Sequence, residues 1–375
     1  MKRLMLATTA LFALSGVTVA AADISISGHV RFHYDAWSDD KKDTDSVAIK
    51  TTKNDAGDFV TAESVSLPAS ANNNNATSTE LNIWVKGSMV TDGGLTIAPE
   101  ARLESAANGG TRHYIKLMDD WGTIILGNHH TPAYTMSVGA DWRGTVSGVA
   151  GTVAPKPANG NVMTGSVTKV TGHKDTKVIY VTPNFGGFKG GVSFADAGAE
   201  SKANATEFVA EYGTSVLTDG NIRLSYVGAM QSAKDGEDKS TKQDNNEIGV
   251  EFTKGPFLVS VLQLSQKATP KKETETRKAK KQGGQEVEVA YDVSSNFKVN
   301  FVYFSAKVDE DSPGDASTKD DKYKATGIGA KYTIAPGLWA SLGYNAFKYT
   351  DATKDKTKNT SNEGNSYRIR VHASF

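Results

Sequence analysis

The segment Ile24–Asp35 reads ISISGHVRFHYD, and its side chains alternate between apolar and polar almost without exception. One set comprises Ile24, Ile26, Gly28, Val30, Phe32 and Tyr34, and the other comprises Ser25, Ser27, His29, Arg31, His33 and Asp35. Because a β-strand projects successive side chains to opposite sides, the segment predicts a strand with one apolar face and one hydrated face. Alternation alone also fits an edge strand of a soluble sandwich whose apolar face packs against a second sheet.

The last nine residues, Tyr367–Phe375 (YRIRVHASF), repeat the pattern and separate these two interpretations. Their polar face carries Arg368, Arg370 and His372 in one row, and such a row requires water rather than a packed core. Their apolar face has an aromatic residue at each end, Tyr367 and Phe375. A strand of this kind is typical of a transmembrane barrel, which presents one face to lipid and the other to its lumen.

Similar patterns predict fourteen further strands, which makes sixteen in all. They are 79–89, 95–104, 111–118, 121–128, 176–182, 187–195, 206–213, 221–228, 246–253, 256–264, 286–292, 296–304, 325–333 and 337–346. The last of the sixteen spans 366–375. The run 256–264 is apolar on both faces and would fit a strand packed beneath a loop. At the other strands the expected inward residues are mostly charged or small, which predicts a water-filled interior.

The connections alternate between short and long. Seven short turns rich in Gly, Pro, Asn and Asp are expected at 91–94, 119–120, 183–187, 218–220, 254–255, 294–295 and 335–337. Between them lie polar stretches at 36–78, 105–110, 129–175, 196–205, 229–245, 265–285, 305–324 and 347–365. We therefore expect an all-β fold: a transmembrane antiparallel up-and-down β-barrel of 16 strands, with short periplasmic turns and long external loops. A barrel of this strand number leaves an aqueous channel.

The first 22 residues have the features of a signal peptide. Lys2 and Arg3 precede an apolar stretch that ends in Ala20-Ala21-Ala22, so residues 1–22 are expected to be removed and 23–375 to form a single barrel domain. The 375 residues include 42 basic and 42 acidic side chains and no cysteine. Because these charges balance, the chain has no overall positive field that would attract nucleic acid. An exported chain without cysteine also has no disulfide scaffold.

The usual enzymatic motifs, such as HExxH, a Walker A loop, GxGxxG after a strand and CxxC, are missing, so no enzyme and no cofactor are expected. A Ser-His-Asp triad on a barrel wall would leave no local motif, so that alternative stays open. No metal site is expected. The pair His129-His130 lacks nearby ligand partners. His29 and His33 would lie about 13 Å apart along a strand, so they fit a titratable lining better than chelation.

Several segments resemble the trimeric general porins of Gram-negative bacteria, in an order that covers the whole mature chain. They are Tyr114-Ile115-Lys116-Leu117, Asp120–Gly127 with Thr131-Pro132, Val178-Ile179-Tyr180 with Pro183 and Gly186-Gly187-Phe188, Lys331-Tyr332, Gly343-Tyr344 and the terminal Phe375. The resemblance implies a homotrimer in outer-membrane lipid. It also implies that Phe375 is an assembly signal read by the outer-membrane assembly machinery.

The resemblance further implies that the third loop, about 129–175, folds inward and narrows the pore. Its candidate constriction residues are Asp141 and Arg143. The arginine often found after the Leu-Gly of the fifth strand is Asn128 here. The loop has only two acidic residues, Asp141 and Asp175, compared with four basic ones, Arg143, Lys156, Lys169 and Lys174. A strongly cation-selective constriction is therefore not expected.

Inward strand positions predict two charged sectors of the pore lining. A basic sector would contain His29, Arg31, His33, Lys86, Arg102, Arg112, Lys116, Arg368, Arg370 and His372. An acidic sector would contain Glu207, Glu211, Glu247, Glu251, Glu286, Glu288 and Asp292. Glu80, Glu100 and Glu104 interrupt the basic side, so the separation is partial. A transverse field of this kind orients dipolar solutes.

These features predict passive diffusion of small hydrophilic solutes and ions through an outer-membrane porin. The alternatives are a substrate-specific channel, for phosphate or sugars, and a soluble exported β-sandwich that binds a ligand.

Overall fold

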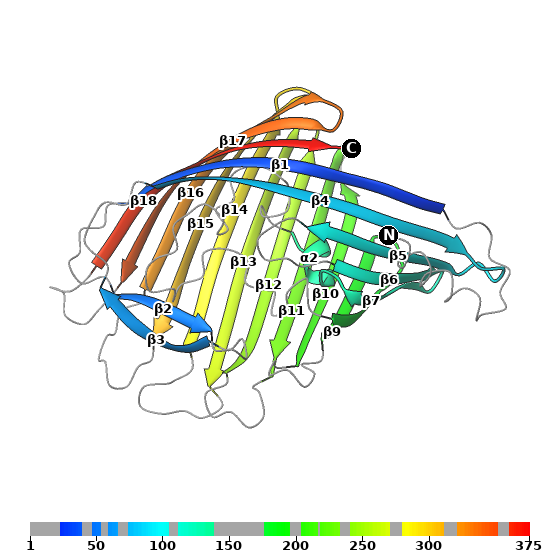
Figure 1. Cartoon of the computed structure of the whole chain (residues 1–375), viewed down its shortest axis with the longest axis horizontal. Helices are drawn as coiled ribbons and strands as arrows, with labels where there is room; N and C mark the ends of the chain where they lie inside the picture. The colour runs from blue at the N-terminus through cyan, green and yellow to red at the C-terminus, as the bar shows by residue number, and fades with distance from the viewer. Residues whose placement is uncertain are drawn as a thin grey trace.

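The computed structural model describes residues 23–39, 47–53, 59–66, 74–104, 112–138, 176–195, 204–216, 218–232, 241–270, 280–310, 321–351 and 360–375. The expected signal peptide, 1–22, and the candidate loop residues Asp141 and Arg143 lie outside these ranges. The described chain forms one closed antiparallel barrel and a separate two-stranded hairpin (Figure 1).

Sixteen strands make up the barrel, as the alternation predicts. They are β1 (Asp23–Asp39), β4 (Asn74–Val90), β5 (Thr96–Glu104), β6 (Arg112–Asp119), β7 (Gly122–Asn128), β8 (Thr176–Val181), β9 (Phe188–Ala195), β10 (Ala205–Val216), β11 (Gly220–Gln231), β12 (Thr241–Lys254), β13 (Phe257–Pro270), β14 (Lys280–Asp292), β15 (Phe297–Glu310), β16 (Asp321–Ala335), β17 (Leu338–Asp351) and β18 (Thr360–Ser374). Each pairs with its neighbour along the chain, and β1 closes the ring by pairing with both β4 and β18. The up-and-down topology is thus confirmed.

One element was not expected. The hairpin of β2 (Val47–Lys53) and β3 (Phe59–Ser66) lies within 36–78, which the sequence predicts as a loop. In Figure 1 this hairpin lies at the end of the barrel where β13 and β15 terminate, opposite the short turns. Several strands also extend beyond their expected limits toward the same end: β13, for example, continues to Pro270 rather than ending at 264.

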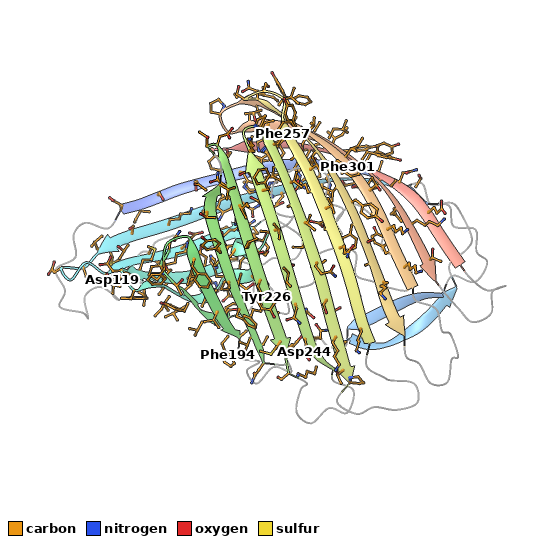
Figure 2. The ribbon with its side chains drawn as sticks, turned by 180° about the vertical axis from the view of Figure 1, so that it is seen from behind. Asp119, Phe194, Tyr226, Asp244, Phe257 and Phe301 are labelled. Carbon is orange, nitrogen blue, oxygen red and sulfur yellow. The ribbon has the colours of Figure 1, made fainter. Side chains whose placement is uncertain are left out.

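The two faces of the sheet differ as the period-two pattern predicts. Ile24 on the outer face of β1 is 73% exposed, whereas His29 on the inward face of the same strand is 5% exposed. Figure 2 labels Phe194, Tyr226, Phe257 and Phe301 on the outer surface of β9, β11, β13 and β15, and all four are exposed. Exposing side chains of this size to water costs about 1.5–3 kcal/mol each, so this surface requires lipid. A single closed sheet with an apolar exterior excludes the β-sandwich alternative.

No helix in the described ranges is long and apolar enough to cross a membrane.

The ring closes at the C-terminal residue. The Gly28 and Phe375 backbones exchange two hydrogen bonds, of 2.9 and 3.0 Å. On the outer face the Phe375 ring covers Gly28 so closely that a Cβ added there would lie 2.4 Å from Phe375 Cζ. An aromatic side chain over a cross-strand glycine protects a strand position that has no side chain of its own.

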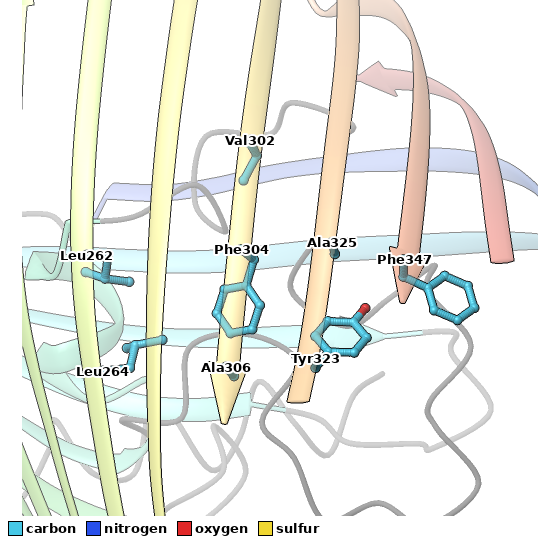
Figure 3. Close-up of a cluster of buried hydrophobic side chains, with 8 residues drawn as sticks. All are labelled: Leu262, Leu264, Val302, Phe304, Ala306, Tyr323, Ala325 and Phe347. Carbon is cyan, nitrogen blue, oxygen red and sulfur yellow. The ribbon is translucent and has the colours of Figure 1, made fainter. Parts of the chain in front are cut away.

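Part of the inner wall is apolar, contrary to the expectation that inward residues are charged or small. Eight buried side chains on β13, β15, β16 and β17 form one cluster (Figure 3): Leu262, Leu264, Val302, Phe304, Ala306, Tyr323, Ala325 and Phe347. Leu262 and Leu264 belong to the run that is apolar on both faces. This run is a regular barrel strand, and its second apolar face contributes to the cluster.

Candidate functional site in the barrel interior

The chain turns into the barrel directly after β7. The short helix α2 (Pro132–Met136) follows, with proline at its start, where the missing N–H costs no helical hydrogen bond. Its Ala133 and Met136 pack on Val209 and Val227, which are inward residues of β10 and β11. Figure 1 shows α2 between the front strands β5 and β6 and the rear strands near β10. The inward course of the third loop is therefore confirmed for residues 129–138.

Two inward glycines make room for this segment. A Cβ at Gly191 on β9 would lie 2.5 Å from Pro132 Cβ, and a Cβ at Gly249 on β12 would lie 2.7 Å from Val138 Cβ. Val138 is 1% exposed. The segment therefore comes closest to the wall at two positions where the wall carries no side chain.

Hydrogen bonds from the wall hold the same segment. The Val138 backbone N–H donates to Ser225 Oγ at 2.9 Å, and Arg223 Nη2 donates to the Met136 carbonyl at 2.9 Å. At the other end of the segment, Lys177 Nζ donates to the His129 carbonyl at 2.9 Å. The two bonds from the charged donors Arg223 and Lys177 are each worth about 1.5–3 kcal/mol, and together with the Val138 bond they fix the start of the loop inside the barrel.

The two adjacent histidines are occupied by other contacts. The His130 ring stacks on Tyr134 at 3.5 Å between centroids and also contacts Arg112. His129 packs edge-on against Tyr114 at 4.4 Å. Burial lowers the pKa of His129 below its ordinary value, against the opposing effect of the hydrogen bond between its Nδ1 and the His130 carbonyl. Among the described residues, no three His, Asp or Glu side chains are grouped as a metal ion would require.

The ten residues of the expected basic sector lie on five adjacent strands: β18, β1, β4, β5 and β6. The register places Arg31 opposite His372, His33 opposite Arg370, and Asp35 opposite Arg368. Arg31 Nε donates to His372 Nδ1 at 3.0 Å. The juxtaposition of the first and last strands is thus as expected.

Carboxylates are interleaved with these cations. Glu104 lies 3.1 Å from Arg102 and 3.2 Å from Arg112. Glu80 lies 3.6 Å from Arg31 and 3.5 Å from Arg102. Asp35 accepts two hydrogen bonds from Arg368, at 2.5 and 2.8 Å. Lys86 lies 4.0 Å from Glu100, and Lys116 lies over the Tyr114 ring. Such pairs hold the arginine side chains in fixed positions and lower the net charge of this wall.

The seven residues of the expected acidic sector lie on β10, β12 and β14, on the opposite half of the ring. Four of them are almost completely buried, with exposures of 0–3%: Glu207, Glu247, Glu286 and Glu288. Glu211, Glu251 and Asp292 are more accessible. Arg223 lies between two of the acids, 2.6 Å from Glu211 and 3.9 Å from Glu251.

Sequence reasoning did not assign a role to Arg223 or Lys177, although both occupy inward positions of expected strands. The alternation of polar and apolar residues, which places both side chains on the inner face, was the signal that could have identified them. Trp84 and Trp339 were also missed, and each ring contacts an inward histidine. The distance between ring centroids is 5.0 Å for Trp84 and His29 and 4.8 Å for Trp339 and His372.

A closed sixteen-stranded barrel with an apolar exterior and charged groups inside defines a channel-forming membrane protein. The chain belongs to the Gram-negative porin family, because the sequence model of that family matches residues 7–373. Family and barrel together place it in the outer membrane.

Solved structures share the fold at low sequence identity. A loop-L8 deletion mutant of OmpT, an outer membrane protein of Vibrio cholerae, is 12% identical with a TM-score of 0.64, covering 95% of this chain and 100% of that one. An anion-selective porin from Comamonas acidovorans is 17% identical with a TM-score of 0.59, covering 95% and 100%. The outer membrane channel DcaP of Acinetobacter baumannii is 13% identical with a TM-score of 0.58, covering 95% and 98%. No curated protein sequence matches the chain significantly.

Proposed function

We propose that this porin is a passive diffusion channel for small hydrophilic solutes and ions. The observation that carries the proposal is the arrangement of charge inside the barrel. Inward cations gather on β18, β1, β4, β5 and β6, and inward carboxylates gather on β10, β12 and β14 across the ring. Charged groups in such numbers need a hydrated path between them.

The two sectors are proposed to line this path and to impose a transverse field on it. Low-dielectric walls focus the field, which orients dipolar solutes and disfavours apolar ones. On the acidic side we assign this role mainly to Glu211, Glu251 and Asp292, because the other four carboxylates of the sector are buried. Arg223 reduces the field locally, because it lies between Glu211 and Glu251.

The third loop, about 129–175, is proposed to form the constriction, with Asp141 and Arg143 as its candidate charged residues. The support comes from residues 129–138, which run inward and are held on the wall by Arg223, Ser225 and Lys177.

Export, assembly and oligomeric state complete the proposal. Residues 1–22 are proposed to be cleaved as a signal peptide, leaving 23–375. Phe375 is proposed to be read by the outer-membrane assembly machinery, and the mature barrel to form a homotrimer. A trimer form is recorded for OmpT of Vibrio cholerae. We further propose that the chain catalyses no reaction and uses no cofactor, so serine-reactive probes should fail to label it.

The test is reconstitution in planar lipid bilayers. Stepwise conductance increments in KCl, together with a finite reversal potential in a salt gradient, are expected. Electrically silent bilayers after verified insertion would contradict the channel.

The alternative function, a substrate-specific channel, differs in how the rate of uptake depends on the solute concentration. A general diffusion channel gives uptake that rises linearly with solute concentration. If phosphate or sugar uptake instead saturates at low concentration, and Arg31→Gln or Arg102→Gln abolishes the saturation, the specific channel is the correct description.

A further inference from the structure

Six side chains on six neighbouring strands form a continuous row along the inner wall, which we call the aromatic strip. The order around the ring is Arg102 on β5, Trp84 on β4, His29 on β1, His372 on β18, Trp339 on β17 and Lys331 on β16. Arg102 lies 5.0 Å from the Trp84 ring, and Trp84 lies 5.0 Å from His29. His29 is 4.7 Å from His372, which is 4.8 Å from Trp339, and Lys331 Nζ lies 4.6 Å from the Trp339 ring.

Cations predominate around this strip. Arg31 donates to His372, and Arg31 and Arg102 both lie near Glu80. Counted with their ion-pair partners, four cations stand against two carboxylates, a net charge of +2: Arg31, Arg102, Arg112 and Lys331 against Glu80 and Glu104. Trp84, Trp339, Arg31 and Lys331 are all partly exposed, so a solute inside the barrel can reach them.

The ring geometry limits what the strip can offer to a guest. Trp339 and His372 are stacked with 12° between their planes, and Lys331 also lies over Trp339. His372 and Lys331 thereby occupy the face of the Trp339 ring, which leaves its edge for a solute. Aromatic edges are positively polarised and aromatic faces negatively polarised, so edges attract the face of another ring.

We propose that the aromatic strip binds planar aromatic carboxylates as they cross the channel, in preference to saturated carboxylates of equal charge. The carboxylate pairs with Arg31 or Lys331, and the ring of the solute lies against the edge of Trp339, the partly exposed indole next to Lys331. A saturated ring gains the charge contact and dispersion, but not the edge-to-face attraction. This inference rests on the proposed channel function.

The test compares benzoate with cyclohexanecarboxylate, which have the same charge and a six-membered ring. Each is titrated against the KCl current of the reconstituted channel, and the half-blocking concentration is measured. One edge-to-face contact predicts half-block by benzoate at an about three- to tenfold lower concentration. Trp339→Leu should remove most of this ratio. Phe347→Leu is the matched control, since Phe347 is an inward aromatic residue of the same strand outside the strip.

A second pair of variants tests the charge contact. Lys331→Gln should raise the half-blocking concentration of both carboxylates while leaving their ratio nearly unchanged, whereas Lys189→Gln on β9 should change neither. Folding of every variant is checked by anomalous gel migration before boiling. A wild-type channel that conducts KCl but shows equal block by the two acids would overturn the aromatic strip as a binding site. Absence of KCl current would instead overturn the proposed channel.

Discussion

Gly249 on β12 matters for the side chain that it lacks. Val138 and Leu262 occupy the space where its Cβ would stand, at 2.7 and 3.1 Å, and Ser225 Oγ lies 2.8 Å away. One glycine therefore joins the inward loop segment, the acidic wall and the edge of the apolar cluster.

Gly249→Ala should displace Val138 and weaken its hydrogen bond to Ser225. Overpacking of this kind costs about 1–3 kcal/mol, so the free energy of unfolding in a urea titration is expected to fall by that amount. The single-channel conductance should change as well, because the loop segment moves relative to the wall.

Gly213→Ala on β10 provides the control, since the nearest atom beyond the adjacent residues, the Ile222 carbonyl oxygen, would be 3.9 Å from the new Cβ. Equal destabilisation by the two variants would mean that Gly249 is not a specific seat for Val138.

The sequence could not pair Val138 with Gly249. Local patterns predict the polar loop that contains Val138 and the alternating strand that contains Gly249. Their contact depends on how far the loop reaches across the interior of the barrel, which no local pattern specifies. The alternation places Gly249 on the inner face of its strand, as it does Arg223 and Lys177. It does not identify the residue that each of them contacts.

At the scale of elements, strands were predictable because each must satisfy one requirement, an apolar side toward lipid and a polar side toward the interior. Ile24–Asp35 and Tyr367–Phe375 meet it almost residue by residue, and their pairing follows once the ring is closed. The hairpin β2–β3 lies outside the barrel, where no membrane imposes alternation, and its sequence carries no comparable pattern.

The β1–β18 junction depends on Gly28. Gly28→Val would place a side chain 2.4 Å from the Phe375 ring and 2.7 Å from the Asn82 carbonyl, so the last strand should dock less tightly. We expect a smaller fraction of the protein to show the anomalous migration of a closed barrel on an unboiled gel.

Gly283→Val on β14 has no such conflict, because the nearest atom to its new Cβ lies 4.0 Å away. If both valine variants close equally well, the Phe375 ring does not require the gap at Gly28.

At the scale of the whole molecule, the two charged sectors should act in opposite directions on ion preference. Arg31→Gln is expected to lower the permeability of chloride relative to potassium, and Glu251→Gln to raise it. Removing one charge near the path should change the ratio by about two- to fivefold. Reversal potentials in a KCl gradient measure both changes.

Both shifts should shrink in molar salt, where the screening length falls to about 3 Å. Shifts of the same sign in the two variants, or shifts that persist at high salt, would contradict a transverse field.

The sectors were predictable in their placement around the ring but not in their accessibility. Strand parity was enough to put Glu207, Glu247 and Glu288 on the inner wall. Their burial depends on how the interior is packed, and that is set by contacts between distant segments, such as those between α2 and β10–β12.

Closure between Gly28 and Phe375 also sets the order of events during biogenesis. Phe375 pairs with Gly28, the sixth residue of β1, so no complete ring exists until β18 has docked on β1. Until then two unpaired strand edges remain open to aggregation. Loop closure over such a separation in sequence is slow, so the open edges persist until β18 reaches β1, and a variant that lacks Phe375 loses both hydrogen bonds that join it to Gly28.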